Sequence, residues 1–436
     1  MKKIVIFTSI SLLLAAAVGI AQEAVDPGRA AKYFEEAQEI SRKDNGHLWG
    51  VPLYGPIVLV DPQTRAVVAN QADAEGQLTK SGKVFVGKLP LKLNIANSDM
   101  NWAGVHWTMI EWPLPEEPEA RARLMMHECF HRIQAKLGLA ATDPVCAHLE
   151  SKDGRIWLQL EWRALEVALE ENGSPRESAL EDALLFRSYR QSLFLKAAKE
   201  ERELELYEGI PEYTGVKLST QSVSEMAAVA VRALRQGRGI ETLARSFAYT
   251  SGPAYGALLD SAAVDWRSHL KVDSDLAALV RNGYRVRPVA VSEGEALRRA
   301  RAYEGEHVIA AETEREAIRR ERLAKGRAKF IENPVLILPA EHFHYSFDPN
   351  RVVPLDDAHV IYAIARVTDD WGVLEAPGGV LIVWEEGGRL QVPAPADVTA
   401  RPLKGDGWTL ALEKGWNIVP GKRAGDYTLK LETQPH

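Results

Sequence analysis

The spacing of hydrophobic residues divides the chain into a mixed N-terminal part, a helical middle and a strand-rich C-terminal part. Hydrophobic positions recur with helical spacing over residues 27–43, and short strand-like runs follow at 48–60, 66–70, 83–89 and 104–112. Helical patterns then dominate up to about residue 270, with long runs at 155–171, 177–204, 221–236 and 253–262. The pattern predicts an α+β chain in which a small sheet precedes a helical half.

From residue 331 onwards, Pro and Gly separate short hydrophobic runs that are typical of strands. The clearest of these runs are 335–338, 360–365, 379–384 and 408–412. We therefore expect residues 331–436 to form a small all-β module. Residues 286–330, which precede it, alternate acidic and basic side chains at three- and four-residue spacing, as a solvated helical linker does.

One predicted helix, over residues 118–137, has clear start and stop signals. Pro118 suits the first helical turn, where its missing N–H is not needed, and nearby acidic residues complement the positive end of the helix dipole. Gly138 is a typical residue just after a helix end. Any motif near the middle of this helix would be held rigidly.

The middle of that helix carries the sequence His127-Glu128-Cys129-Phe130-His131. Histidines four residues apart lie on one helix face, so both imidazoles can bind the same zinc ion. Glu128 can then take a proton from a zinc-bound water. This pattern predicts a zinc-dependent hydrolase, the alternative being two ordinary histidines on a helix.

A second segment resembles the gluzincin metallopeptidases, in which H-E-x-x-H is followed by E-G-x-A-x-Y on another helix. Here the segment reads Glu208-Gly209-Ile210-Pro211-Glu212-Tyr213. The resemblance implies that Glu208 is the third zinc ligand and that Glu212 orients a ligating histidine. Pro211 departs from the family pattern and predicts that the helix is kinked or begins there. Glu161, on the helix expected at 155–171, is the alternative third ligand or else the buried partner of an arginine.

Two further features of the same family can be placed. The sequence Tyr249-Thr250-Ser251-Gly252 resembles a helix start whose Tyr hydrogen-bonds to the oxyanion, which implies this role for Tyr249, with Tyr255 as the alternative. The strand within 101–112 corresponds to an edge strand that pairs with extended substrate, the alternative being an ordinary core strand rich in Trp. The family fold thus implies a zincin-like catalytic domain at 22–285, with a helical insertion at about 141–204 between the two motifs.

The first 21 residues have the pattern of a signal peptide: Lys2 and Lys3, then an apolar run ending in small residues. We expect cleavage after Ala21, a periplasmic or secreted protein and no membrane span in the mature chain, the alternative being an uncleaved membrane anchor. The formal charge of −7 gives no general affinity for nucleic acid. The only cysteines, Cys129 and Cys146, could pair in an oxidising compartment, but the sequence leaves their pairing open.

The sequence therefore predicts an exported zinc metallopeptidase that acts on a peptide or protein substrate. The alternative is a non-catalytic envelope protein that uses the same fold for binding or assembly. His342 and His344 alternate along a predicted strand and could share a metal, but no third ligand is evident nearby. Specificity and oligomeric state leave no signal in the sequence.

Overall fold

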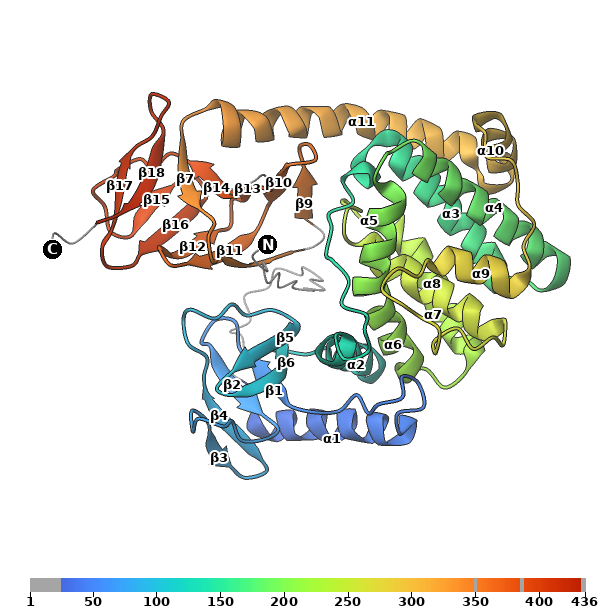
Figure 1. Cartoon of the computed structure of the whole chain (residues 1–436), viewed down its shortest axis with the longest axis horizontal. Coiled ribbons are helices and arrows are strands. Elements are labelled where there is room, and N and C mark those ends of the chain that lie inside the picture. The colour runs from blue at the N-terminus through green and yellow to red at the C-terminus, as the bar shows by residue number, and fades with distance from the viewer. Residues whose placement is uncertain (1–24, 349–350, 385–387, 433–436) are drawn as a thin grey trace. The chain divides into compact units, whose positions relative to one another are not determined.

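A computed structural model describes residues 25–348, 351–384 and 388–432 (Figure 1). Within these residues the chain forms two compact units. The larger comprises residues 25–88 and 98–315, and the smaller comprises 89–97 and 316–432. The chain is a mixture of helices and strands, with an N-terminal sheet, a helical middle and C-terminal strands, as the hydrophobic pattern predicts.

The sheet of the larger unit has six strands in the order β3-β4-β2-β1-β6-β5. The strands are β1 (Ile57–Val60), β2 (Ala66–Ala69), β3 (Thr79–Ser81), β4 (Val84–Lys88), β5 (Ser98–Trp102) and β6 (Val105–Glu111). Strand β6 runs parallel to β1 and antiparallel to β5. The expectation of an edge strand within 101–112 is wrong for β6, which is an interior strand, as the alternative of an ordinary core strand predicts; the chain turns back at Ala103-Gly104, and β5 forms the edge.

Helices make up the rest of the larger unit. They are α1 (Pro27–Asp44), α2 (Pro118–Gln134), α3 (Lys152–Glu170), α4 (Gly173–Ser192), α5 (Ala197–Leu204), α6 (Ile210–Ser219), α7 (Val223–Gly237), α8 (Phe247–Ser261), α9 (Leu276–Tyr284), α10 (Glu293–Ala300) and α11 (Gly305–Arg327), which continues into the smaller unit. Short helical turns of the larger unit are η1 (Ala147–Glu150), η2 (Glu205–Gly209) and η3 (Arg301–Tyr303), whereas η4 (Ala328–Glu332) follows α11 in the smaller unit. No helix among the described residues is long and apolar enough to cross a membrane, and the predicted signal peptide lies outside them.

The core of the larger unit joins α2 to α6. Trp49 packs against Phe130 of α2 and Tyr213 of α6, with ring centroids 5.1 and 6.3 Å apart. Its indole N–H donates to the Thr214 hydroxyl (3.0 Å), so this buried aromatic side chain is also satisfied as a donor. The packing of Trp49 thus fixes the two helices that carry the sequence motifs relative to each other.

The smaller unit contains two sheets. One has the order β17-β18-β7-β14-β13-β10-β9 and the other β15-β16-β12-β11-β8. The strands are β7 (Val335–Pro339), β8 (His344–Phe347), β9 (Val352–Pro354), β10 (His359–Tyr362), β11 (Ala365–Asp369), β12 (Gly372–Ala376), β13 (Val380–Val383), β14 (Arg389–Pro393), β15 (Leu403–Gly405), β16 (Trp408–Leu412), β17 (Trp416–Pro420) and β18 (Tyr427–Leu431). The prediction of C-terminal β structure is confirmed.

Candidate metal centre

Helix α2 is built much as its sequence predicts. The Glu117 side chain caps it by accepting a hydrogen bond from the Ala120 N–H (2.8 Å), and Pro118 occupies the first turn. The helix ends at Gln134, three residues before the predicted end, and Gly138 follows with a positive φ of 73°. The histidine pair therefore lies in the second half of a well-anchored helix, facing α6 and η2.

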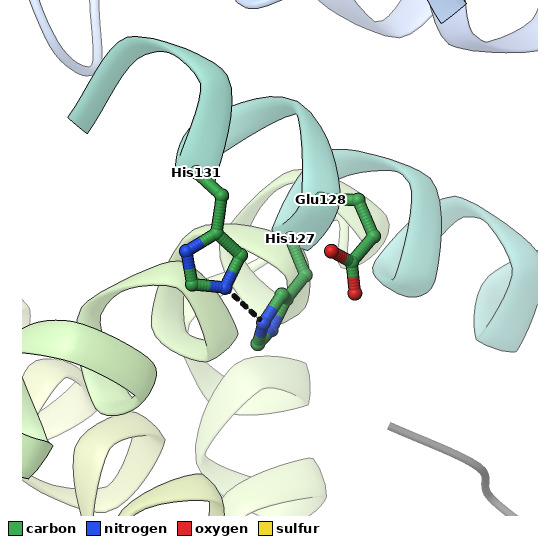
Figure 2. A group of neighbouring side chains, drawn as sticks. All are labelled: His127, Glu128 and His131. Carbon is green, nitrogen blue, oxygen red and sulfur yellow. Dashed lines mark hydrogen bonds between the residues drawn. The ribbon is translucent and has the colours of Figure 1, made fainter. Parts of the chain in front are cut away.

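The imidazoles of His127 and His131 converge (Figure 2). Their Nε2 atoms are 3.0 Å apart. On the far side of each ring, Nδ1 is held by an acceptor: that of His127 donates to Glu212 Oε2 (2.7 Å), and that of His131 donates to Gln134 Oε1 (3.0 Å). Such bonds fix the ring orientation and direct both Nε2 atoms towards a common ligand.

Glu208 completes a triangle of possible ligand atoms. Its Oε2 lies 3.6 Å from His127 Nε2 and 3.4 Å from His131 Nε2, and its side chain is fully buried. Tetrahedral zinc with bonds of about 2.0–2.1 Å separates its ligand atoms by about 3.3–3.4 Å. The separations of 3.0, 3.4 and 3.6 Å lie on both sides of this value, so the donor set fits zinc in size as well as in chemistry.

A π-helical turn places Glu208 in this position. In η2 the N–H of Ile210 reaches the carbonyl of Glu205, five residues back, so the helix widens at this point. Helix α6 begins immediately afterwards, with Pro211 in its first turn. Pro211 thus lies just after a π-helical turn within a continuous helical run from Ala197 to Ser219, so the helix is widened near Pro211 and does not start anew there.

Glu161, the alternative third ligand, belongs to a separate buried network. Its Oε2 lies 2.5 Å from Arg190 Nη1, and its Oε1 accepts a hydrogen bond from the Tyr255 hydroxyl (2.6 Å). The interpretation of Glu161 as the buried partner of an arginine is confirmed. Tyr255, the alternative to Tyr249, is held in the same network by that bond.

Glu128 lies beside the histidine pair on the same helix. One of its oxygens and one nitrogen of each histidine lie within 4.8 Å of one another (Figure 2). The described part of the chain offers no hydrogen-bond partner to either carboxylate oxygen, although both are buried. Burial raises the pKa of Glu128 to about 7, outweighing the two histidines, which lower it. A buried carboxyl group with this pKa can exchange a proton near neutral pH.

Tyr249, on the first turn of α8, stacks on His127 with ring centroids 5.7 Å apart and an interplanar angle of 13°. Within the described residues its buried hydroxyl has no partner that meets hydrogen-bond geometry. Burial, followed by the nearby Glu208 carboxylate, raises the pKa of this phenol well above its usual value. Tyr249 is therefore a proton-bearing donor at neutral pH.

Two charged residues beside Glu208 left no signal in the sequence: Arg245 and Asp143. Arg245 Nη2 lies 3.4 Å from Glu208 Oε1, and its Nη1 contacts Asp143 Oδ1. Both lie outside regular elements, where no periodicity indicates which way a side chain points. Arg123, which pairs with Glu212, was equally unmarked.

The other candidate residues do not belong to the group of His127, Glu128 and His131. Cys129 and Cys146 are both buried and free. His342 lies near Asp369 and Asp370 in an exposed group, whereas His344 is outside that group. His342 and His344, which the sequence only allowed as a possible metal pair, are therefore not brought together in one ligand group.

Comparisons of this chain with protein-family profiles, with curated proteins and with solved structures give no match.

Proposed function

We propose that this chain is an exported zinc-dependent metallopeptidase with a zincin-like catalytic domain of the gluzincin type, active in the periplasm or outside the cell. His127, His131 and Glu208 would hold the metal, and a peptide or protein would be the substrate. The observation that carries the proposal is the buried triangle of two Nε2 atoms and one carboxylate oxygen, beside the unpartnered carboxylate of Glu128. Two imidazoles and a carboxylate are a typical donor set for catalytic zinc.

Bound zinc would supply a Lewis acid that lowers the pKa of a coordinated water and polarises the carbonyl of the substrate. The residues of the chain supply the rest. Glu128 accepts the proton of the attacking water at its carboxylate and holds it for the leaving amine. Tyr249 donates its phenolic hydrogen to the developing oxyanion. Glu212 keeps the His127 ring in the tautomer that presents Nε2.

Three substitutions test the proposal on the mature chain, purified and supplied with zinc. Glu128→Gln should keep one zinc per chain and lose hydrolysis of a labelled, denatured protein substrate by ~10²–10⁴-fold, because the general base is gone. Glu208→Gln should lose zinc affinity. Glu161→Gln is the matched control, since Glu161 is an equally buried glutamate, and it should keep the zinc.

A wild-type chain that binds no zinc, or a Glu208→Gln variant that binds it as tightly as wild type, would contradict the proposal. Zinc binding without hydrolysis, together with full biological function of Glu128→Gln, would instead support the alternative of an envelope binding or assembly protein. Such a protein has no need of a general base.

A further inference from the structure

The two oxygens of the Glu208 carboxylate have different surroundings. Oε2 faces the two histidine Nε2 atoms, and no described residue provides it with a hydrogen bond. Oε1 faces the guanidinium of Arg245, whose Nη2 is 3.4 Å away. This long hydrogen bond engages Oε1, whereas Oε2 is left to face the two histidines.

Arg245 is itself held in place by Asp143. Its Nη1 forms an ion pair with Asp143 Oδ1, and the side chains of Asp143, Arg245 and Glu208 are 0–3% exposed, so the pair is shielded from bulk solvent. The segments that carry the two residues are also joined, because the Cys146 N–H donates to the Ala244 carbonyl (2.9 Å). Glu150 Oε1 further accepts from the Ala244 N–H (2.8 Å), which fixes the turn that precedes α8.

We propose that Arg245 and Asp143 form a clamp of positioning residues, which holds Glu208 as a monodentate ligand and balances the charge beside the metal. The inference rests on the proposed zinc site. Asp143 cancels the charge of Arg245, so the guanidinium can orient the carboxylate without repelling a divalent cation. Neither residue touches the reacting atoms, and both act through Glu208.

The clamp predicts how variants bind metal. Asp143→Asn removes both the anchor of Arg245 and the negative charge that balances it. The Glu208 carboxylate is then less well oriented, and the unbalanced guanidinium repels the cation. Both effects lower zinc affinity, which should fall ~10–100-fold. Arg245→Lys keeps the charge but cannot reach both carboxylates with one ammonium, and a smaller loss in the same direction is expected. The double variant should be little weaker than Asp143→Asn alone, because the two residues act as one unit.

The experiment is a zinc titration of each folded variant against a chelator of known affinity, with circular dichroism to verify the fold. The control is Arg155→Lys, which perturbs another buried pair, Arg155–Glu312, whose Nε–Oε2 distance is 3.0 Å. This control should lose stability but keep zinc affinity. Cobalt substitution gives a second readout. In the Asp143→Asn variant, Glu208 Oε1 is no longer held by Arg245 and can also bind the cobalt. The coordination number then rises, so the visible absorption of the cobalt-substituted variant should weaken.

Wild-type affinity and an unchanged cobalt spectrum in both Asp143→Asn and Arg245→Lys would overturn the clamp and leave the zinc site standing. A wild-type chain without zinc affinity would overturn both. If Asp143→Asn does not fold, the Arg245→Lys titration decides the matter, since it retains the charge of the buried pair.

Discussion

The close packing of α8 on the π-helical turn predicts that Gly252→Ala will damage the metal centre without touching any ligand. A Cβ atom on Gly252 would lie 2.3–2.5 Å from the O, Cα and C atoms of Gly209, the residue next to Glu208. Carbon atoms pack at about 3.5–4.0 Å, so the two backbones must separate by about 1 Å to admit the methyl group. The displaced segment carries either Glu208 or Tyr249.

The expected magnitude has two parts. Overpacking of this kind should lower the free energy of unfolding by about 1–3 kcal/mol. A 1 Å movement of Glu208 would also enlarge the ligand triangle, whose longer sides are now 3.4 and 3.6 Å, beyond the span that tetrahedral zinc bridges. Zinc affinity should then fall at least ~10-fold, because one of the three proposed ligands is displaced.

Urea unfolding of the metal-free protein and a zinc titration measure the two parts separately. Gly209→Ala is a graded comparison: its Cβ would meet Ala248 O and Gly252 Cα at 3.1 Å, so its effect should have the same sign and be smaller. Gly294→Ala is the control, because its Cβ would have no neighbour within 4 Å. Equal stability and zinc affinity in Gly252→Ala and wild type would refute the reasoning that this backbone contact sets the site.

Two further predictions concern charged hydrogen bonds. Glu212→Gln should weaken zinc binding ~10–100-fold with little change in fold, as measured by chelator competition, because the carboxylate that orients His127 Nδ1 is lost. Burial lowers the pKa of His148, but Glu200 and Glu201 outweigh it and raise the pKa above its ordinary value. The stability from protonated His148 is thus complete below pH ~6.5 and is lost as pH rises through the raised pKa. In His148→Asn, unfolding in urea should show ~1.5–3 kcal/mol less stability at pH 6 and a flatter decline towards high pH; equal pH profiles would contradict this.

Local sequence signals predict the elements of the larger unit well, because each depends on neighbouring residues. Helix α2 has its proline, acidic first turn and terminal glycine within some 20 positions, and the structure places it at Pro118–Gln134. Glu208 and His131 are separated by 76 residues in the chain, and their proximity in space was predicted only from the family resemblance. The hydrophobic periodicity of the chain does not predict that α3, α4 and α5 fold back and bring η2 beside α2.

The features that sequence reasoning missed depend on long-range packing. Strand β6 is interior because β5 adds to its outer side, and strand order is not encoded in the hydrophobic alternation of a single strand. Arg245 and Asp143 meet only because their two loops are bonded together. A charged residue in a loop is ordinarily solvated, so nothing in its local sequence distinguishes a buried ion pair from a surface residue.

The charges of the centre lead to a last prediction, on proton release. The Arg123–Glu212 and Arg245–Asp143 pairs cancel, which leaves the carboxylates of Glu208 and Glu128. Burial alone would lower the pKa of His127, but the surrounding glutamates, Glu128 first, raise it to about 10. Without metal, His127 is therefore protonated at neutral pH, and zinc must displace at least about one proton to bind its Nε2.

Calorimetric zinc titrations at pH 7 in buffers of different ionisation enthalpy should reveal that proton, and zinc affinity should rise with pH. The stability of the metal-free protein should move the other way: the contribution of protonated His127 is complete below pH ~6.5 and disappears as pH rises towards 10. Zinc binding without proton release would mean that His127 is already neutral at pH 7. That result would contradict the negative charges of Glu208 and Glu128, which raise the pKa of His127.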